Sequence, residues 1–172
     1  MGFGVMIDQD SVGCHCVILT FYRSIQGNHR MNAQNGYDIE DLQPGMSASL
    51  AKTVTEADLI LFSGVSMDTN PVHLNEEFAK TTMFGGRIAH GMLSAGFISA
   101  VLANKLPGPG TIYLGQTLKF KAPVRPGDTV TATVTVKEVD VAEKRCVLQT
   151  VCTVAGKPVI EGEATTMCSS RG

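Results

Sequence analysis

The clearest pattern along the chain is an alternation of threonine and aliphatic residues over 129–136, which reads TVTATVTV. A period of two places successive side chains on opposite faces of a β-strand, so this segment is predicted to be a strand with one buried face. Less regular patterns predict three further strands, over 112–121, 145–155 and 158–167. The last two connections, at 140–144 and 156–157, are short enough to favour antiparallel hairpins.

A second pattern is a stretch without charge between His90 and Lys105. It mixes large apolar residues with serine, alanine and glycine, and a Pro-Gly-Pro-Gly run at 107–110 ends it. A helix that is apolar all round is buried, so 92–104 is predicted to be a core helix that is covered on every side. One such helix followed by four strands suggests an antiparallel sheet wrapped around the helix, and the pattern alone gives the α+β class.

Shorter elements are predicted before this helix. Weak alternation over 47–53 indicates a strand. Thr55 followed by Asp58 is typical of a capped helix start. A second short helix is expected from Asn75, because two acidic residues follow it in what would be the first turn. The segment between the two helices is then predicted to be a turn.

Composition narrows the class of protein. The chain has 172 residues, 44% hydrophobic and 17% charged, which fits one compact domain. Its formal net charge of −2 gives no general attraction for nucleic acid or a membrane surface. The five cysteines are odd in number and lack C-x-x-C spacing, which favours reduced thiols in a cytosol-like compartment. Cys14-His15-Cys16 lacks a second pair of ligands, so no metal is expected.

The first 36 residues differ in composition from the rest. The apolar run from Val17 to Tyr22 is far too short to span a bilayer, and no basic segment precedes it as a signal peptide requires. The polar residues after Met31 are typical of a flexible lead-in. Residues 1–36 are therefore predicted to be a dispensable extension before a single domain over 37–172.

The strongest candidate chemistry lies in the run Ser66-Met67-Asp68-Thr69-Asn70-Pro71-Val72-His73. Asn70 is pushed towards an extended conformation by the proline that follows it, and such a sequence favours a turn. A turn here can aim Asp68 and His73 into one pocket, where a carboxylate and an imidazole can move a proton. The alternative is an ordinary loop between helices, with His73 as a polar surface residue.

The start of the uncharged helix is a second candidate. It reads Ala89-His90-Gly91-Met92, and a helix N-terminus offers free backbone N–H groups and the positive end of the helix dipole. Glycine allows a ligand to approach the backbone closely, or else Gly91 only eases the chain into the helix. His90 either faces a ligand or caps and packs the helix start.

Several separated blocks agree in order and spacing with one known family. The blocks are Phe62-Ser63-Gly64, 68–73 with Ala79, His90-Gly91-Met92 and Gly115-Gln116-Thr117-Leu118-Lys119-Phe120. They resemble the MaoC-like, or type 2, (R)-specific enoyl-CoA hydratases, over about Tyr37 to Met167. Members of that family often have a tyrosine in place of Phe62 and a small residue in place of Met67. These departures could alter the shape of the pocket but not the acid–base pair.

The resemblance implies a fold, an activity and a setting. The fold is the hot-dog fold, and the expected assembly is a homodimer whose sheets join edge to edge. The activity is (R)-specific hydration of trans-2-enoyl thioesters to (R)-3-hydroxyacyl thioesters and the reverse dehydration, in fatty-acid or polyhydroxyalkanoate metabolism. The coenzyme A thioester is the substrate and no cofactor is expected. The expected location is cytoplasmic.

The resemblance also implies roles for individual residues. Asp68 and His73 are expected to hold one water, one taking its proton and the other delivering a proton to the α-carbon. The Gly91 N–H is expected to stabilise negative charge on the thioester oxygen. Substrate contacts are expected from Asn70, His90, Met92, Lys119 and Lys121. The alternative role of Asn70 is that of a turn residue.

Three basic residues between positions 119 and 125 have two possible roles. Lys119, Lys121 and Arg125 could meet the phosphates of the carrier, as ammonium and guanidinium groups do. Alternatively they belong to a solvated strand face.

Rival functions remain open on the same fold. A hot-dog thioesterase commonly has a catalytic carboxylate on the central helix, and 3-hydroxyacyl-[acyl carrier protein] dehydratases of this architecture usually pair a histidine with an acid there. The segment 91–104 contains neither aspartate nor glutamate, which argues against both. A non-catalytic acyl-binding module is a third possibility, although it leaves the Asp68–His73 pair without a purpose.

Overall fold

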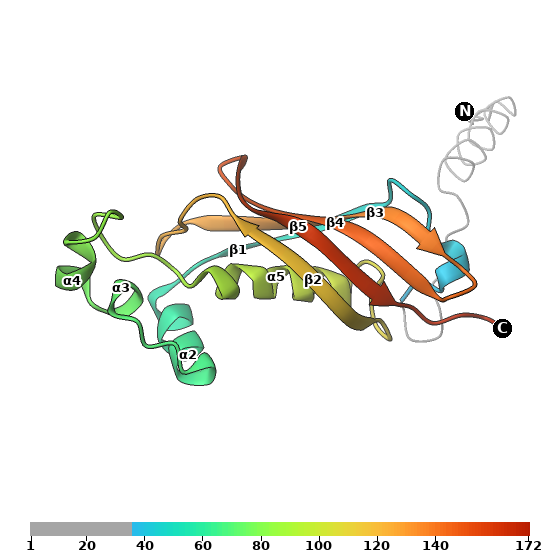
Figure 1. Ribbon diagram of the computed structural model, residues 1–172, viewed down its shortest axis with the longest axis horizontal. Coiled ribbons are helices and arrows are strands. Elements are labelled where there is room, and N and C mark those ends of the chain that lie inside the picture. Colours follow the sequence, from blue (N-terminus) through green and yellow to red (C-terminus); the bar gives the residue numbers. More distant parts are fainter. Residues whose placement is uncertain (1–35) are drawn as a thin grey trace, which may run out of the picture.

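The computed structural model describes residues 36–172, so nearly all of the expected N-terminal extension, including Cys14, His15 and Cys16, lies outside the described residues. In chain order the elements are η2 (Ile39–Asp41), β1 (Ser47–Thr53), α2 (Glu56–Ser66), α3 (Pro71–Leu74), α4 (Glu76–Lys80), α5 (Gly91–Asn104), β2 (Ile112–Phe120), β3 (Thr129–Asp140), β4 (Arg145–Val154) and β5 (Lys157–Met167). Figure 1 shows the sheet along one side of α5, with α2, α3 and α4 grouped at one end of the molecule.

The five strands form one sheet in the order β1-β3-β4-β5-β2, and every neighbouring pair is antiparallel. The two hairpins predicted from the short connections are confirmed, and β4 and β5 join through Ala155 and Gly156. Both residues have positive φ angles, 48° and 78°, as tight hairpins require. The α+β prediction, with an antiparallel sheet around one apolar helix, is therefore confirmed.

Strand β3 shows why its sequence pattern was informative. Val130, Ala132, Val134 and Val136 are buried, whereas the threonines between them are partly exposed. The buried aliphatic side chains pack with α5 in the main hydrophobic core. Burying one face of a central strand in this way supplies the hydrophobic stabilisation that holds helix and sheet together.

The prediction that the central helix is covered on every side is wrong for the single chain. Ile98, Val101 and Leu102 are buried, but Met92, Gly96, Ser99 and Ala103 are exposed along the other face of α5. The sheet can cover only one side of a helix, and the opposite stripe consists largely of small residues. Absence of charge in the sequence therefore did not mean that this chain alone covers the whole helix.

The helices before α5 match their predicted starts. Thr55 and Asp58 form a capping box at the start of α2, and the Asn75 side chain caps α4. A hydrogen bond from the Thr55 backbone N–H and the ion pair with Lys52 lower the pKa of Asp58 to about 2. The segment predicted as a plain turn contains the one-turn helix α3. Among residues 36–172, no helix has both the length and the hydropathy needed to cross a membrane.

Candidate active site

The turn that carries the two candidate catalytic residues begins where α2 ends. Met67 closes the helix in the left-handed conformation, with φ 59° and ψ 13°. A residue with a Cβ is strained there, so glycine would be the least strained residue at this position. The reversal at Met67 directs the chain into Asp68 and then towards α3.

Two side chains of the turn accept hydrogen bonds from the backbone of the same segment. One Asp68 carboxylate oxygen, Oδ1, accepts a hydrogen bond from the Asn70 N–H at 3.2 Å, and Asn70 Oδ1 accepts one from the Val72 N–H at 3.2 Å. Asn70 is thereby the N-cap of α3, and Pro71 occupies the first helical position, where no N–H is needed. The local sequence thus fixes the turn that brings His73 back towards Asp68.

His73 is almost buried, with 8% of its surface exposed. Its Nδ1 lies 2.9 Å from the carbonyl oxygen of Ile88. A carbonyl can only accept, so Nδ1 carries a proton, and in the neutral ring Nε2 then has a free lone pair. Nε2 lies 3.9 Å from Asp68 Oδ2, and half of the Asp68 side chain is exposed. The imidazole is therefore fixed in orientation, and the gap to the carboxylate is longer than a direct hydrogen bond and is one that a water can bridge.

These two side chains face a cavity of about 540 Å³. The lining residues are Asp68, His73, Met83, Phe84, Ile88, Ala89, His90, Gly91, Met92, Ser94, Phe120, Lys121, Ala122, Pro123, Val124 and Ile160. Of the residues predicted as site residues, the cavity brings together Asp68, His73, His90, Gly91, Met92 and Lys121. Asn70 and Lys119 do not line it.

The N-terminus of α5 opens onto the same cavity. The His90 side chain makes no capping hydrogen bond, so the first N–H groups of the helix are not taken up by the N-cap side chain. Gly91 lies under the ring of Phe120, and a Cβ built at Gly91 would stand 2.5 Å from Phe120 Cε1. Glycine at this position therefore leaves room for both the aromatic ring and a close approach to the backbone.

Sequence reasoning missed most of the apolar lining of the cavity. Phe120, Pro123 and Val124 come from the end of β2 and the loop after it, and Met83 and Phe84 from the loop between α4 and α5. Phe120 ends the block Gly115–Phe120, which was the one signal that could have marked it. Nothing in the sequence near Met83 indicates that this loop reaches the cavity.

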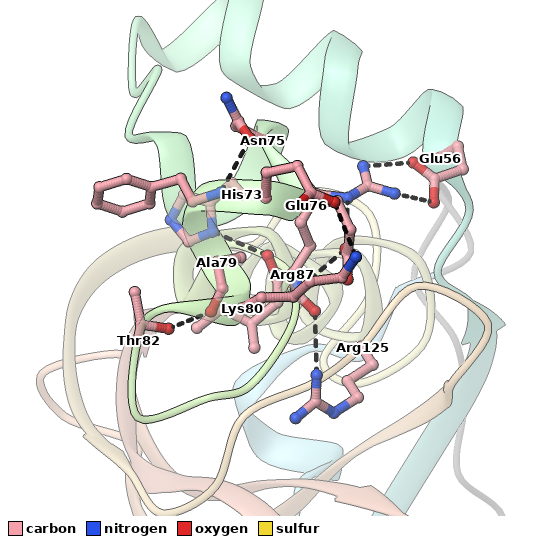
Figure 2. A network of polar contacts seen from close by, with 12 residues as sticks. Glu56, His73, Asn75, Glu76, Ala79, Lys80, Thr82, Arg87 and Arg125 are labelled. Carbon is pink, nitrogen blue, oxygen red and sulfur yellow. Dashed lines mark hydrogen bonds and ion pairs between the residues drawn. The ribbon is translucent and has the colours of Figure 1, made fainter.

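The basic residues divide between structural and cavity positions. Arg125 donates to the carbonyl oxygen of Phe84 at 2.5 Å, and Arg87 forms a two-pronged ion pair with Glu56 and a further one with Glu76 (Figure 2). These contacts tie the loop before α5 to α2, α4 and the segment after β2. Lys121 lines the cavity and lies 3.5 Å from a carboxylate oxygen of Glu161.

Two other features of the described residues bear on alternative chemistry. Burial raises the pKa of the Cys146 thiol to about 12 and that of Cys152 to about 11, so neither is a ready nucleophile. Asp68, His73 and His90 have donor atoms within 4.8 Å of one another. The two imidazoles lie with centroids 3.8 Å apart and planes 31° apart, and His73 Nδ1 and His90 Nε2 already donate to backbone carbonyls. These hydrogen bonds leave one ring nitrogen of each histidine as a possible metal ligand.

Comparison with known proteins agrees with the geometry. The model of the MaoC like domain matches residues 41–162, which is more than half of the chain. The chain belongs to the MaoC-like family. An (R)-specific enoyl-CoA hydratase of Rhodospirillum rubrum is 66% identical over 133 residues, which cover 77% of this chain and 92% of that protein. A 3-hydroxybutyryl-CoA dehydratase of Methylorubrum extorquens is 47% identical over 73% of this chain and 80% of its own length.

Solved structures of this MaoC-like protein's relatives show the same fold. The (R)-hydratase PhaJ1 from Pseudomonas aeruginosa is 45% identical with a TM-score of 0.74, covering 79% of this chain and 88% of that one. The (R)-hydratase from Aeromonas caviae, described as involved in PHA biosynthesis, is 41% identical with a TM-score of 0.72, covering 74% and 97%. The hot-dog fold expected from the resemblance is thus confirmed.

Proposed function

We propose that this MaoC-like protein is an (R)-specific enoyl-CoA hydratase. It adds water to trans-2-enoyl-CoA to give the (R)-3-hydroxyacyl-CoA and catalyses the reverse dehydration, in fatty-acid or polyhydroxyalkanoate metabolism. The single observation that carries the proposal is the Asp68–His73 pair, with Nε2 and Oδ2 3.9 Å apart, facing a largely apolar cavity next to the α5 N-terminus. The names of the two curated relatives described above support the reaction class.

The geometry supports separate roles for the Asp68–His73 pair and for the N-terminus of α5. A water held between Asp68 and His73 gives up a proton to one member of the pair as its oxygen bonds to C3. The pair returns a proton to C2, so that it ends in the state in which it began. The enolate-like charge that develops on the thioester oxygen is stabilised by the Gly91 N–H and the positive end of the α5 dipole.

Substrate contacts follow from the lining of the cavity. Met92 and Phe120 provide apolar surface for the acyl group beside Gly91. Lys121 is the predicted phosphate partner that lines the cavity, whereas Arg125 is engaged with backbone carbonyls. We propose no role in substrate binding for Asn70, whose side chain caps α3, or for Lys119, which lies outside the lining.

The rival enzymes are less well supported. Helix α5 of this chain carries no carboxylate that could serve the hydrolysis of a thioester. A mitochondrial 3-hydroxyacyl-[acyl-carrier-protein] dehydratase of Solanum lycopersicum is 35% identical over 75% of this chain, so a carrier-protein thioester is a second candidate substrate. We propose coenzyme A as the carrier because relatives that are more similar carry that substrate in their names.

The reaction class can be tested with one substrate. Incubated with trans-2-butenoyl-CoA (crotonyl-CoA), the protein is expected to remove the absorbance of the enoyl group while the thioester stays intact. After chemical hydrolysis of the thioester product, chiral chromatography should give the (R)-3-hydroxy acid, and the carrier-protein thioester run in parallel should react more slowly. Release of free thiol with the double bond preserved would establish a thioesterase and contradict the proposal.

We further propose that the protein is a cytoplasmic homodimer in which the β2 edges of two sheets pair. Strand β2 is an edge strand, and its residues Ile112, Tyr113 and Leu114 are exposed apolar side chains. An exposed edge strand with such residues is a template for pairing, and the exposed stripe of α5 is a second uncovered surface.

The oligomeric state can be measured directly. Sedimentation equilibrium is expected to give twice the chain mass of 18.3 kDa. A charge placed on the edge by Leu114→Lys should shift the protein towards the monomer, because it leaves an unpaired charge in the interface. The matched control is Val141→Lys, an exposed apolar residue in the turn between β3 and β4 and away from the β2 edge. A wild-type protein that sediments as a monomer would contradict this part of the proposal.

A further inference from the structure

His90 makes a set of contacts that substrate binding does not explain. Only 2% of its surface is exposed, although it borders the cavity. It stands at the N-cap of α5 but makes no capping hydrogen bond with its side chain. Its ring lies against His73 with centroids 3.8 Å apart and planes 31° apart, and Phe62 lies on it at 5.0 Å and 54°. The His90 ring therefore packs against the rings of both His73 and Phe62.

The hydrogen bonds of His90 identify its tautomer. Nε2 lies 3.0 Å from the backbone carbonyl oxygen of Asp68 and 3.3 Å from Ser63 Oγ. The Ser63 hydroxyl already donates to the Leu59 carbonyl at 2.9 Å, so it can only accept from His90. With two acceptors in reach, Nε2 must carry the proton. Nδ1, the other ring nitrogen, is buried and makes no hydrogen bond among the described residues.

Two of these contacts involve the catalytic pair, one with each member. The Nε2–H holds the backbone of Asp68, and therefore the place from which its carboxylate projects. The ring face limits how His73 can tilt about its own hydrogen bond to Ile88. His90 lies 22 and 17 residues along the chain from Asp68 and His73, so it is a tertiary contact that the two residues share.

We propose that His90 is a positioning residue of the reaction: it sets the separation of Asp68 Oδ2 from His73 Nε2 and does not contact the substrate. This inference rests on the proposed function, since it assigns a role within the proposed acid–base pair. Misplacement of a catalytic group by about 1 Å can cost roughly 10²-fold in rate. Loss of His90 is therefore expected to lower kcat with little change in KM.

Three variants separate its two contacts. His90→Gln keeps an N–H donor at a similar reach but removes the flat ring, whereas His90→Phe keeps a ring against His73 and removes the donor. His90→Ala removes both. Per folded active site, His90→Ala is expected to lower kcat by about 10²-fold and the two partial variants by about tenfold each, with KM within about threefold of wild type. The matched control is Thr166→Val, a fully buried polar side chain that does not line the cavity.

Two outcomes of these measurements would overturn the proposal, and one would support it. A substrate-binding role would raise KM in His90→Ala and leave kcat near wild type, which overturns the proposal. If His90 is merely structural, His90→Ala will lower the thermal midpoint, as Thr166→Val is expected to do, without a change in kcat per folded site. That result also overturns the proposal. A kcat in one or both partial variants that lies about tenfold above that of His90→Ala supports it.

A second readout does not depend on activity. Long-range ¹H–¹⁵N NMR spectra of the imidazoles should show the proton of His90 on Nε2 and that of His73 on Nδ1. The opposite tautomer at His90 overturns the inference even if the enzyme is active. If the wild type shows the expected tautomers but does not hydrate enoyl-CoA, the proposed function fails while the arrangement of His90 stands.

Discussion

Replacing Asp68 by asparagine or His73 by glutamine is expected to lower kcat by roughly 10²-fold or more, the usual scale for a lost general acid or base. Asparagine can keep the hydrogen bond from the Asn70 N–H, because its amide oxygen replaces Asp68 Oδ1. His73→Asn is a useful second variant, since its amide N–H can replace Nδ1–H towards the Ile88 carbonyl. The Asp68 and His73 variants should therefore fold, and the loss of activity should appear in kcat rather than in the amount of native protein.

The double variant gives the sharper result. Because the two side chains face one water across 3.9 Å, their effects should not multiply, and the double variant should be much less impaired than the product of the single losses. Glu77→Gln, an exposed acid on the neighbouring helix α4, is the control and should keep wild-type kcat. Near wild-type turnover in either folded single variant would remove that residue from the chemistry and return it to the role of a turn residue.

Shortening Ile98 to alanine is expected to destabilise the fold by about 2–5 kcal/mol, because Ile98 is fully buried in the middle of α5 and its loss leaves a cavity under the sheet. The free energy of unfolding should be measured from urea titrations at one fixed protein concentration, since association adds to apparent stability. Asn104→Ala, at the exposed end of the same helix, should change stability by no more than about 0.5 kcal/mol.

The stability result tests the architecture rather than the chemistry. If Ile98→Ala and Asn104→Ala unfold at the same urea concentration, α5 is not the central helix of the core. A folded Ile98→Ala protein should retain a measurable kcat, because Ile98 does not line the cavity.

Short-range signals in the sequence were enough for much of the scaffold. The alternation in 129–136 placed β3, since a period of two is a property of each residue and its immediate neighbours. The same holds for the capping pair Thr55 and Asp58 and for the hairpin between the last two strands, although its turn lies at Ala155 and Gly156, one residue before the predicted position at 156–157. The motif from Asp68 to His73 likewise marked the candidate pair, because its Asn-Pro step closes the turn within a few residues.

The sequence by itself therefore determined the strands, the helix starts and the two residues proposed to move protons. Only the tertiary structure decided what surrounds them. It placed the His90 ring behind His73, laid Phe120 over Gly91, and engaged Arg125 with the loop before α5. It also left one stripe of the uncharged helix uncovered by its own sheet. These contacts join segments far apart along the chain, and their geometry depends on how whole elements pack, which no local pattern of residues encodes.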